Sequence, residues 1–198
     1  RKYSKSSIKN ERGPVGHGDK IMENYRHLYV VMELENGKIL PVSLEMLGEA
    51  RRLMDDFNTK YFSKEKVVAV LLGHEIKEFS KQLIEYGADV VIYSDNPELK
   101  DVRNTIYTKV ISQIAQDNRT LCEVEQEYAI EIKRPRYMFF AADSIGRHLS
   151  STVLTELESG LASDINKLVV EDIEMSHRQK TGGVKETYAK TLEMYRPD

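Results

Sequence analysis

The sequence has 198 residues, of which 40% are hydrophobic and 31% charged, a composition typical of a water-soluble chain built around one large domain. Its net charge of −3 argues against the broad positive field of nucleic-acid-binding proteins, and the single cysteine, Cys122, excludes an internal disulfide and a cysteine-rich metal site. No apolar stretch approaches the roughly 20 residues of a membrane span, so we expect a soluble, cytoplasmic protein that binds neither nucleic acid nor membrane.

The chain begins with a polar segment. Residues 1–24 contain several glycines and show no sustained hydrophobic period, so we expect an N-terminal extension there and a folded domain over residues 25–198. Leu28–Met32 reads as a buried strand, and a turn follows at Asn36-Gly37. Ser43 is then expected to cap a helix whose buried face carries Leu44, Leu47, Ala50, Met54 and Phe57.

Three further strands are predicted, each followed by a helical pattern. They are Val67–Leu72, Val90–Tyr93 and Tyr137–Ala142, and an acidic insertion over residues 121–131 precedes the last of them. Four alternations of strand and helix imply parallel strands joined by right-handed crossovers. The predicted fold class is therefore α/β: a doubly wound, mostly parallel, Rossmann-like sheet of the adenine-nucleotide-hydrolase kind, with helices on both faces.

Ligands of such sheets gather at the carboxyl ends of the strands, where the strand order reverses. The four ends expected here are Glu33–Asn36, Gly73-His74, Ser94–Asn96 and Asp143–Arg147. At two of the four ends a local structural role is favoured over ligand binding. Gly73-His74 suits a tight exit from its strand, and Asp95-Asn96-Pro97 suits the start of the next helix, with leucine, valine and isoleucine positions from Leu99 to Ile114 on its buried face. The phosphate-binding motifs G-x-G-x-x-G and G-x-x-x-x-G-K-[ST] are absent, and the histidines have no metal-ligand spacing.

The fourth end carries an arginine in the first turn of a helix. A cation is unfavourable there, because a helix N-terminus already has partial positive charge. Ser144, the permissive Gly146 and Arg147 could together hold a phosphate, a pyrophosphate or the electron-rich edge of an aromatic cofactor. The equally weighted alternative is a surface arginine paired with an acidic residue of a neighbouring chain.

Three motifs in order resemble the large (alpha) subunit of electron-transferring flavoproteins, over about residues 25–198. They are "NGKILPVSLEMLGEARRL" (Asn36–Leu53), "VVAVLLGHEIKEFSKQLIEYGADVVIYSDNPEL" (Val67–Leu99) and "SIGRHLSSTVLTELESGLASD" (Ser144–Asp164). In that family the first motif follows a strand that ends in Glu. The Gly-Lys-Ile-x-Pro-Val and Leu-Leu-Gly-His elements are especially similar to subunits that support acyl-CoA dehydrogenases and electron bifurcation.

The resemblance implies a redox carrier that acts with an oxidoreductase, with this segment as the N-terminal scaffold and interface domain. In the family, FAD binds mainly to a C-terminal domain that follows an Arg-Pro like Arg196-Pro197, and we expect the 198 residues to lack that domain. The partner is a small (beta) subunit, which holds AMP or, in bifurcating members, a second FAD. The resemblance also assigns Arg147 to a contact with the small subunit's flavin, and we expect Gly146 and Ser144 of the same turn to share in this contact.

The sequence departs from the family pattern beside this arginine. His148 replaces the usual Asp, Ser151 lies near the usual Pro, and Ala141-Ala142-Asp143 replaces Gly-Ala-Thr. Arg147 is kept, but contacts made through the missing Asp cannot be carried over. Two other functions fit the predicted fold: a stand-alone adenine-nucleotide-binding or stress-type domain, and an interaction module that binds no cofactor.

Overall fold

The computed structural model describes residues 3–7, 25–116, 134–157, 167–176 and 185–197. The acidic insertion and the Gly160–Asp164 end of the third motif lie outside these ranges. The chain divides into two compact units, Arg12–Ser159 and the pair of segments Arg1–Glu11 and Gly160–Asp198. Each unit is described by itself.

The larger unit is built on a parallel sheet of four strands in the order β6-β5-β2-β7. The strands are β2 (Leu28–Val31), β5 (Val67–Gly73), β6 (Val90–Asp95) and β7 (Tyr137–Phe139). Leu28 of the central strand β2 is in register with Val67 on one side and Tyr137 on the other. The strands β2 and β5 are buried throughout, as expected for a parallel sheet covered on both faces. The predicted doubly wound α/β fold is confirmed.

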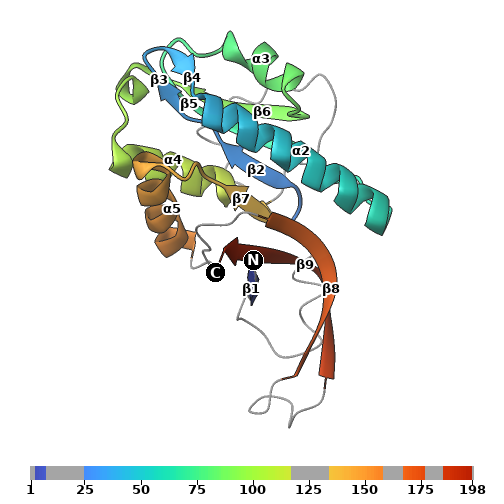
Figure 1. The fold of residues 1–198 in the computed structure, drawn as a ribbon. Helices are drawn as coiled ribbons and strands as arrows, with labels where there is room; N and C mark the ends of the chain where they lie inside the picture. Colours follow the sequence, from blue (N-terminus) through green and yellow to red (C-terminus); the bar gives the residue numbers. More distant parts are fainter. Residues whose placement is uncertain (1–2, 8–24, 117–133, 158–166, 177–184, 198) are drawn as a thin grey trace. The chain divides into compact units, whose positions relative to one another are not determined.

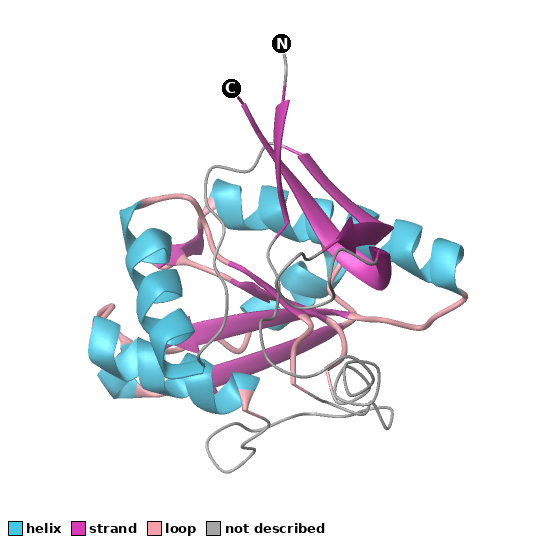
Figure 2. Ribbon diagram, turned by 90° about the horizontal axis from the view of Figure 1, so that it is seen from below, coloured by secondary structure: helices cyan, strands magenta, loops and turns pink. Residues whose placement is uncertain are grey.

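Helices cover both faces of this sheet (Figures 1 and 2). Helices α2 (Pro41–Tyr61) and α3 (Phe79–Glu85) contact the sheet at β2, β5 and β6. Helices α4 (Asn104–Ala115) and α5 (Ser144–Leu157) contact each other. Alternate strand residues such as Tyr29, Val31 and Val70 share a core cluster with Ile111 of α4 and Leu149 of α5. The two-residue period of each strand therefore divides its side chains between two hydrophobic layers.

Two predicted helix starts differ from the structure. Helix α2 begins at Pro41 with Leu40 as N-cap, so Ser43 is not its cap. After β6, Asn96 caps a short 3-10 helix, η1 (Pro97–Leu99), and α4 begins only at Asn104. Leu99 is buried as expected, but Val102 lies between the two helices and is 42% exposed.

The predicted turn at Asn36-Gly37 is confirmed. It joins β3 (Leu34–Glu35) to β4 (Lys38–Ile39) in an antiparallel hairpin. Asn36 and Gly37 have φ values of 51° and 70°, the left-handed pair that a two-residue hairpin turn requires.

The smaller unit is an antiparallel sheet in the order β1-β9-β8. Its strands are β1 (Tyr3–Ser7), β8 (Lys167–Ser176) and β9 (Lys185–Pro197), with a register shift between Glu171 and Ile173. Tyr3 pairs with Pro197, so the two ends of the chain lie on neighbouring strands. The sequence pattern predicted none of these strands. That residues 1–24 act as a separate extension stays a prediction.

Candidate functional site

The strand order places the topological switch point between β2 and β7. The chain moves outward from β2 through β5 to β6, and then returns to pair β7 with the other edge of β2. Helices leave a crevice beside the strand ends at such a point, where ligands of open α/β sheets bind. Of the four strand ends singled out by sequence, those at Glu33 and at Asp143–Arg147 lie at this position.

Asp143 organises the turn from β7 into α5. Its side-chain Oδ1 accepts a hydrogen bond from the Gly146 amide at 2.8 Å, and its carbonyl accepts one from the Arg147 amide at 3.0 Å. This is the geometry of an N-cap, in which a carboxylate also offsets the positive end of the helix. The amides of Gly146 and Arg147 are therefore already bonded within the protein.

Arg147 and Ser144 are exposed on this turn. The Arg147 Nε donates a hydrogen bond to the Ala142 carbonyl at 3.2 Å, which ties the guanidinium to the loop that leads into the helix. The three predicted site residues thus share one helical turn, with Ser144 and Arg147 at the surface and Gly146 buried beneath them.

Gly146 is buried because it lies against the strand ends. A Cβ added at this position would collide with the Ala141 carbonyl oxygen and lie 2.8 Å from Oε1 of Glu33. The close approach of helix α5 to β2 and β7 therefore depends on a residue without a side chain.

Glu33 is the functional residue that sequence reasoning overlooked. Its side chain is 7% exposed, and its backbone amide donates to Oγ of Ser43 at 3.0 Å, which is the actual role of that buried serine. Burial, followed by the hydrogen bond and the negative charge of Asp143, raises the pKa of Glu33 to about 8. The available sequence signal was the polar residue directly after an apolar strand: this strand end was among the four expected to face ligands, but no role was predicted for the Glu33 carboxyl group.

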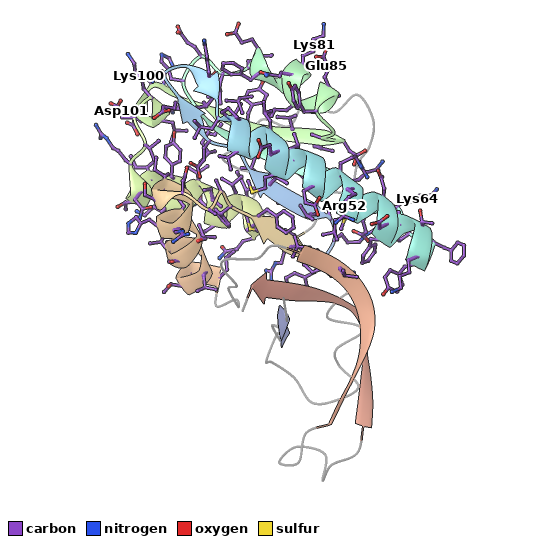
Figure 3. The ribbon with its side chains drawn as sticks, viewed as in Figure 1. Arg52, Lys64, Lys81, Glu85, Lys100 and Asp101 are labelled. Atoms are coloured by element: carbon purple, nitrogen blue, oxygen red, sulfur yellow. The ribbon has the colours of Figure 1, made fainter. Side chains whose placement is uncertain are left out.

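Glu33 also lines a small hollow beside the switch point. Its other lining residues are apolar except for one tyrosine: Val31, Met32, Leu34, Leu72, Val102, Tyr107, Ile145 and Leu149. Val102 and Ile145 are 42% and 39% exposed and form its outer part. Lys100 and Asp101, which precede Val102, are exposed and point away from the sheet (Figure 3). The site therefore combines an exposed guanidinium, a buried carboxyl and exposed apolar surface.

The other two strand ends carry local structure, as the sequence favoured. The Asp95 carboxylate accepts hydrogen bonds from the amides of Glu75 at 2.7 Å and Ile76 at 2.9 Å, which hold the loop after β5. A Cβ on Gly73 would approach Ile76 to 2.6 Å, so this exit from the strand is tight. Asn96 accepts from the Glu98 amide at 2.9 Å and caps η1.

Within the described ranges, no group of three His, Cys, Asp or Glu residues could hold a metal ion. No helix that the structure describes has both the length and the apolar composition that a membrane span requires.

The sheet order and the position of the site define a Rossmann-type α/β domain whose candidate ligand site is at the switch point between β2 and β7. Within that class, the chain belongs to the electron transfer flavoprotein family: the model of the Electron transfer flavoprotein domain matches residues 28–193.

Relatives of known name agree with this family assignment. The chain is 34% identical over 151 residues to the Electron transfer flavoprotein subunit alpha of Thermoanaerobacterium thermosaccharolyticum, covering 76% of this chain and 39% of the relative. It is 34% identical over 155 residues to the Acryloyl-CoA reductase electron transfer subunit beta of Anaerotignum propionicum, covering 78% and 36%. Protein FixB of Bradyrhizobium diazoefficiens is 30% identical over 152 residues, covering 75% and 36%. The matched part is less than two-fifths of each relative's length.

Proposed function

We propose that this chain is the N-terminal scaffold and interface domain of an electron-transferring flavoprotein alpha subunit. The whole protein would carry electrons between a donor and an acyl-CoA dehydrogenase or a quinone-linked oxidoreductase. Family membership and the named relatives support this proposal. FAD would bind mainly to a C-terminal domain, which the additional length of the relatives could contain. The complex would work in the cytoplasm.

The partner of the domain would be the small (beta) subunit, as a heterodimer. That subunit would hold AMP or, in a bifurcating complex, a second FAD. The Gly-Lys-Ile-x-Pro-Val and Leu-Leu-Gly-His elements of the sequence favour the bifurcating form.

The observation that supports a contact with the cofactor is the exposed Arg147 guanidinium at the switch point. A flavin supplies one- and two-electron chemistry when bound. Arg147 would lie against the flavin of the small subunit and favour its negatively charged form, while the capped turn fixes where the guanidinium can reach. Ser144, on the same exposed turn, would add a hydroxyl contact, and the exposed Ile145 fits a planar apolar ring edge.

The test is to co-produce this protein with its small subunit and to compare the wild type with Arg147→Ala and Arg147→Lys. A partly buried charge contact contributes about 1.5–3 kcal/mol. We therefore expect Arg147→Ala to weaken flavin retention roughly 10- to 150-fold, or to lower the two-electron potential of the flavin. Arg147→Lys should recover only part of the wild-type flavin retention and potential, because an ammonium lacks the planar fork of a guanidinium.

Two results would contradict this role for Arg147. If Arg147→Ala loosens the heterodimer but leaves flavin content and potential per intact dimer unchanged, the arginine only pairs with an acidic residue at the interface. If the isolated chain releases an adenine nucleotide on denaturation and the dimer contains no flavin, a stand-alone nucleotide-binding domain is the better assignment. If the isolated chain releases no adenine nucleotide and the dimer contains no flavin, a pure interaction module is the better assignment.

A further inference from the structure

Two carboxyl groups from distant parts of the chain meet beneath the first turn of α5. Glu33 follows strand β2 and Asp143 follows strand β7. Oε1 of Glu33 lies 2.8 Å from the position that a Cβ on Gly146 would take, and the Gly146 amide donates to Oδ1 of Asp143 at 2.8 Å, so both carboxyl groups lie against the same residue and interact. Both Glu33 oxygens are buried, and no described N–H or hydroxyl donates a hydrogen bond to either of them. Among the described residues, the polar side chain that acts on these two oxygens is therefore another carboxyl group, which as a carboxylate offers them no proton.

Two ionised carboxylates have only acceptor oxygens, so they cannot hydrogen-bond to each other. They would also repel strongly where water is excluded. One shared proton removes both problems, because a neutral carboxylic acid donates through its O–H. The raised pKa of Glu33, about 8, agrees with this requirement from geometry.

The surroundings decide which residue holds the proton. Asp143 is less buried than Glu33, and its Oδ1 already accepts a hydrogen bond from the Gly146 amide at 2.8 Å. Glu33 lines an otherwise apolar hollow, which disfavours a charge on it. The proton therefore belongs mainly to Glu33.

We propose that Glu33 is a positioning residue for Arg147: as a neutral acid it donates a hydrogen bond to Asp143 and keeps that carboxylate in place as the cap of α5. The chain of contacts is continuous. Ser43 holds the Glu33 backbone at 3.0 Å, and the backbone carbonyl of Glu33 accepts from Leu40 at 2.9 Å. Asp143 in turn holds the amides of Gly146 and Arg147.

The shared proton also sets the charge beside the arginine. With Glu33 neutral, Asp143 and Arg147 carry one negative and one positive charge. With both carboxyls ionised, the turn would carry an excess negative charge, which would weaken the attraction of Arg147 for an anionic ligand. This part of the inference rests on the proposed function, whereas the shared proton does not.

The proton is tested directly by infrared spectroscopy of the 198-residue chain at neutral pH. We expect a carbonyl band of a protonated carboxylic acid in the wild type, its loss in Glu33→Gln, and its retention in the matched control Glu35→Gln. Glu35 is two residues away and exposed, so its substitution leaves the buried carboxyl pair unchanged. Absence of the band in the wild type, or its survival in Glu33→Gln, would overturn the proposal whatever the protein's cofactor.

Positioning is tested in the heterodimer with the small subunit. Glu33→Ala should weaken flavin retention roughly three- to tenfold, since one hydrogen bond to a capping carboxylate is lost. Glu33→Gln should keep most of the wild-type flavin retention, because the glutamine amide also donates to Asp143. In an Arg147→Ala background, Glu33→Ala should have no further effect on the flavin.

Equal losses from Glu33→Ala with and without Arg147 would refute a role through the arginine. If Glu33→Ala does not fold, a loss of flavin from Glu33→Gln as large as the three- to tenfold loss expected for Glu33→Ala would refute this role instead. If Arg147→Ala itself leaves the flavin unchanged, the proposed function fails, while the infrared result still decides the shared proton.

Discussion

At the scale of single residues, Arg147 shows how an unfavourable charge is accommodated. A guanidinium in the first turn of a helix meets the positive end of the helix dipole. Asp143 opposes this effect with a carboxylate that accepts the Gly146 amide, and the Ala142 carbonyl accepts from Arg147 itself at 3.2 Å. The guanidinium is thus held at the surface on a turn whose backbone amides are largely bonded.

Gly146 should not tolerate a side chain. Gly146→Ala would drive a methyl group against the Ala141 carbonyl and Glu33, so we expect a loss of about 1–3 kcal/mol in the free energy of unfolding, measured by urea denaturation. The matched control is Gly48→Ala in α2, where nothing lies within 4 Å of the new methyl group. That substitution should stabilise the protein by about 0.5–1 kcal/mol. Equal effects of the two substitutions would refute the close contact.

The protonation of Glu33 gives a pH dependence of stability with a defined sign. Its folded pKa, about 8, is above the ordinary 4.5, so the neutral form stabilises the fold fully below pH 4.5. This contribution is lost as the pH rises towards 8, because the unfolded chain ionises first. Glu33→Gln should therefore become more stable than wild type by a few kcal/mol, on the order of one per pKa unit, between pH 4.5 and 8. A constant difference between the two proteins across this range, in parallel urea titrations, would contradict the raised pKa.

At the scale of elements, a second buried carboxylate joins the starts of β2 and β5. Glu65 is 5% exposed and accepts hydrogen bonds from the His27 amide at 2.6 Å and from Nε of Arg26 at 3.0 Å. Burial alone would raise the pKa of Glu65, but the hydrogen bonds from His27 and the charge of Arg26 outweigh it and lower the pKa to about 2. His27 itself has a φ of 71°, so this carboxylate also holds an unusual backbone conformation.

Removal of Glu65 should therefore be costly. We expect Glu65→Ala to lower the free energy of unfolding by about 2–3 kcal/mol at pH 7, because charged hydrogen bonds at a buried position are lost. Since the folded pKa is depressed, this stabilisation is present above pH 4.5 and is lost as the pH falls towards 2. Glu49→Ala is the control, because Glu49 pairs with Arg52 at the exposed surface of α2, and its loss should cost under about 1 kcal/mol. Similar costs for the two substitutions at pH 7 would contradict the role of Glu65.

The elements that sequence predicted best have their own local signal. The strands β2, β5 and β6 were predicted to within one or two residues, because continuous apolar runs mark strands buried on both faces. The start of α4 was misplaced, since Leu99 is buried from a 3-10 turn and not from the helix. Ser43 was misread because its hydroxyl bonds to Glu33, a contact between a strand end and a helix that no local pattern contains.

The candidate site was predicted only in part, because only one of its two key residues has a local sequence signal. Arg147 stood out because its charge conflicts with the helix end that its own segment forms. Glu33 gave no such conflict, because its environment depends on Asp143, 110 positions away in the sequence. The sequence pattern could locate the strand end at Glu33 but could not show that β2 and β7 are neighbours.

At the scale of the whole molecule, the two units differ in how far sequence could predict them. The α/β unit follows from repeated local alternation of strand and helix. In the other unit, β1 pairs with β9 across almost the full length of the chain, and β9 pairs with β8. The pairing of β1 with β9 joins distant segments and has no short-range sequence signature, so β1 was not predicted. Strands β8 and β9 follow each other in the chain, and the sequence analysis missed their local pattern.

The last prediction concerns flavin binding by the chain on its own. A cofactor of this size needs a pocket of about 300–1,000 Å³ that encloses most of its surface. The hollow beside Glu33 has room inside for about one water molecule, and the sequence contains neither phosphate-binding motif. We therefore expect the isolated 198-residue chain to retain no stoichiometric FAD after gel filtration, as judged by absorbance near the flavin maximum. The complex with the small subunit should retain flavin under the same conditions. Tight one-to-one FAD on the isolated chain would show that this domain is itself the flavin-binding part, and the scaffold role would have to be abandoned.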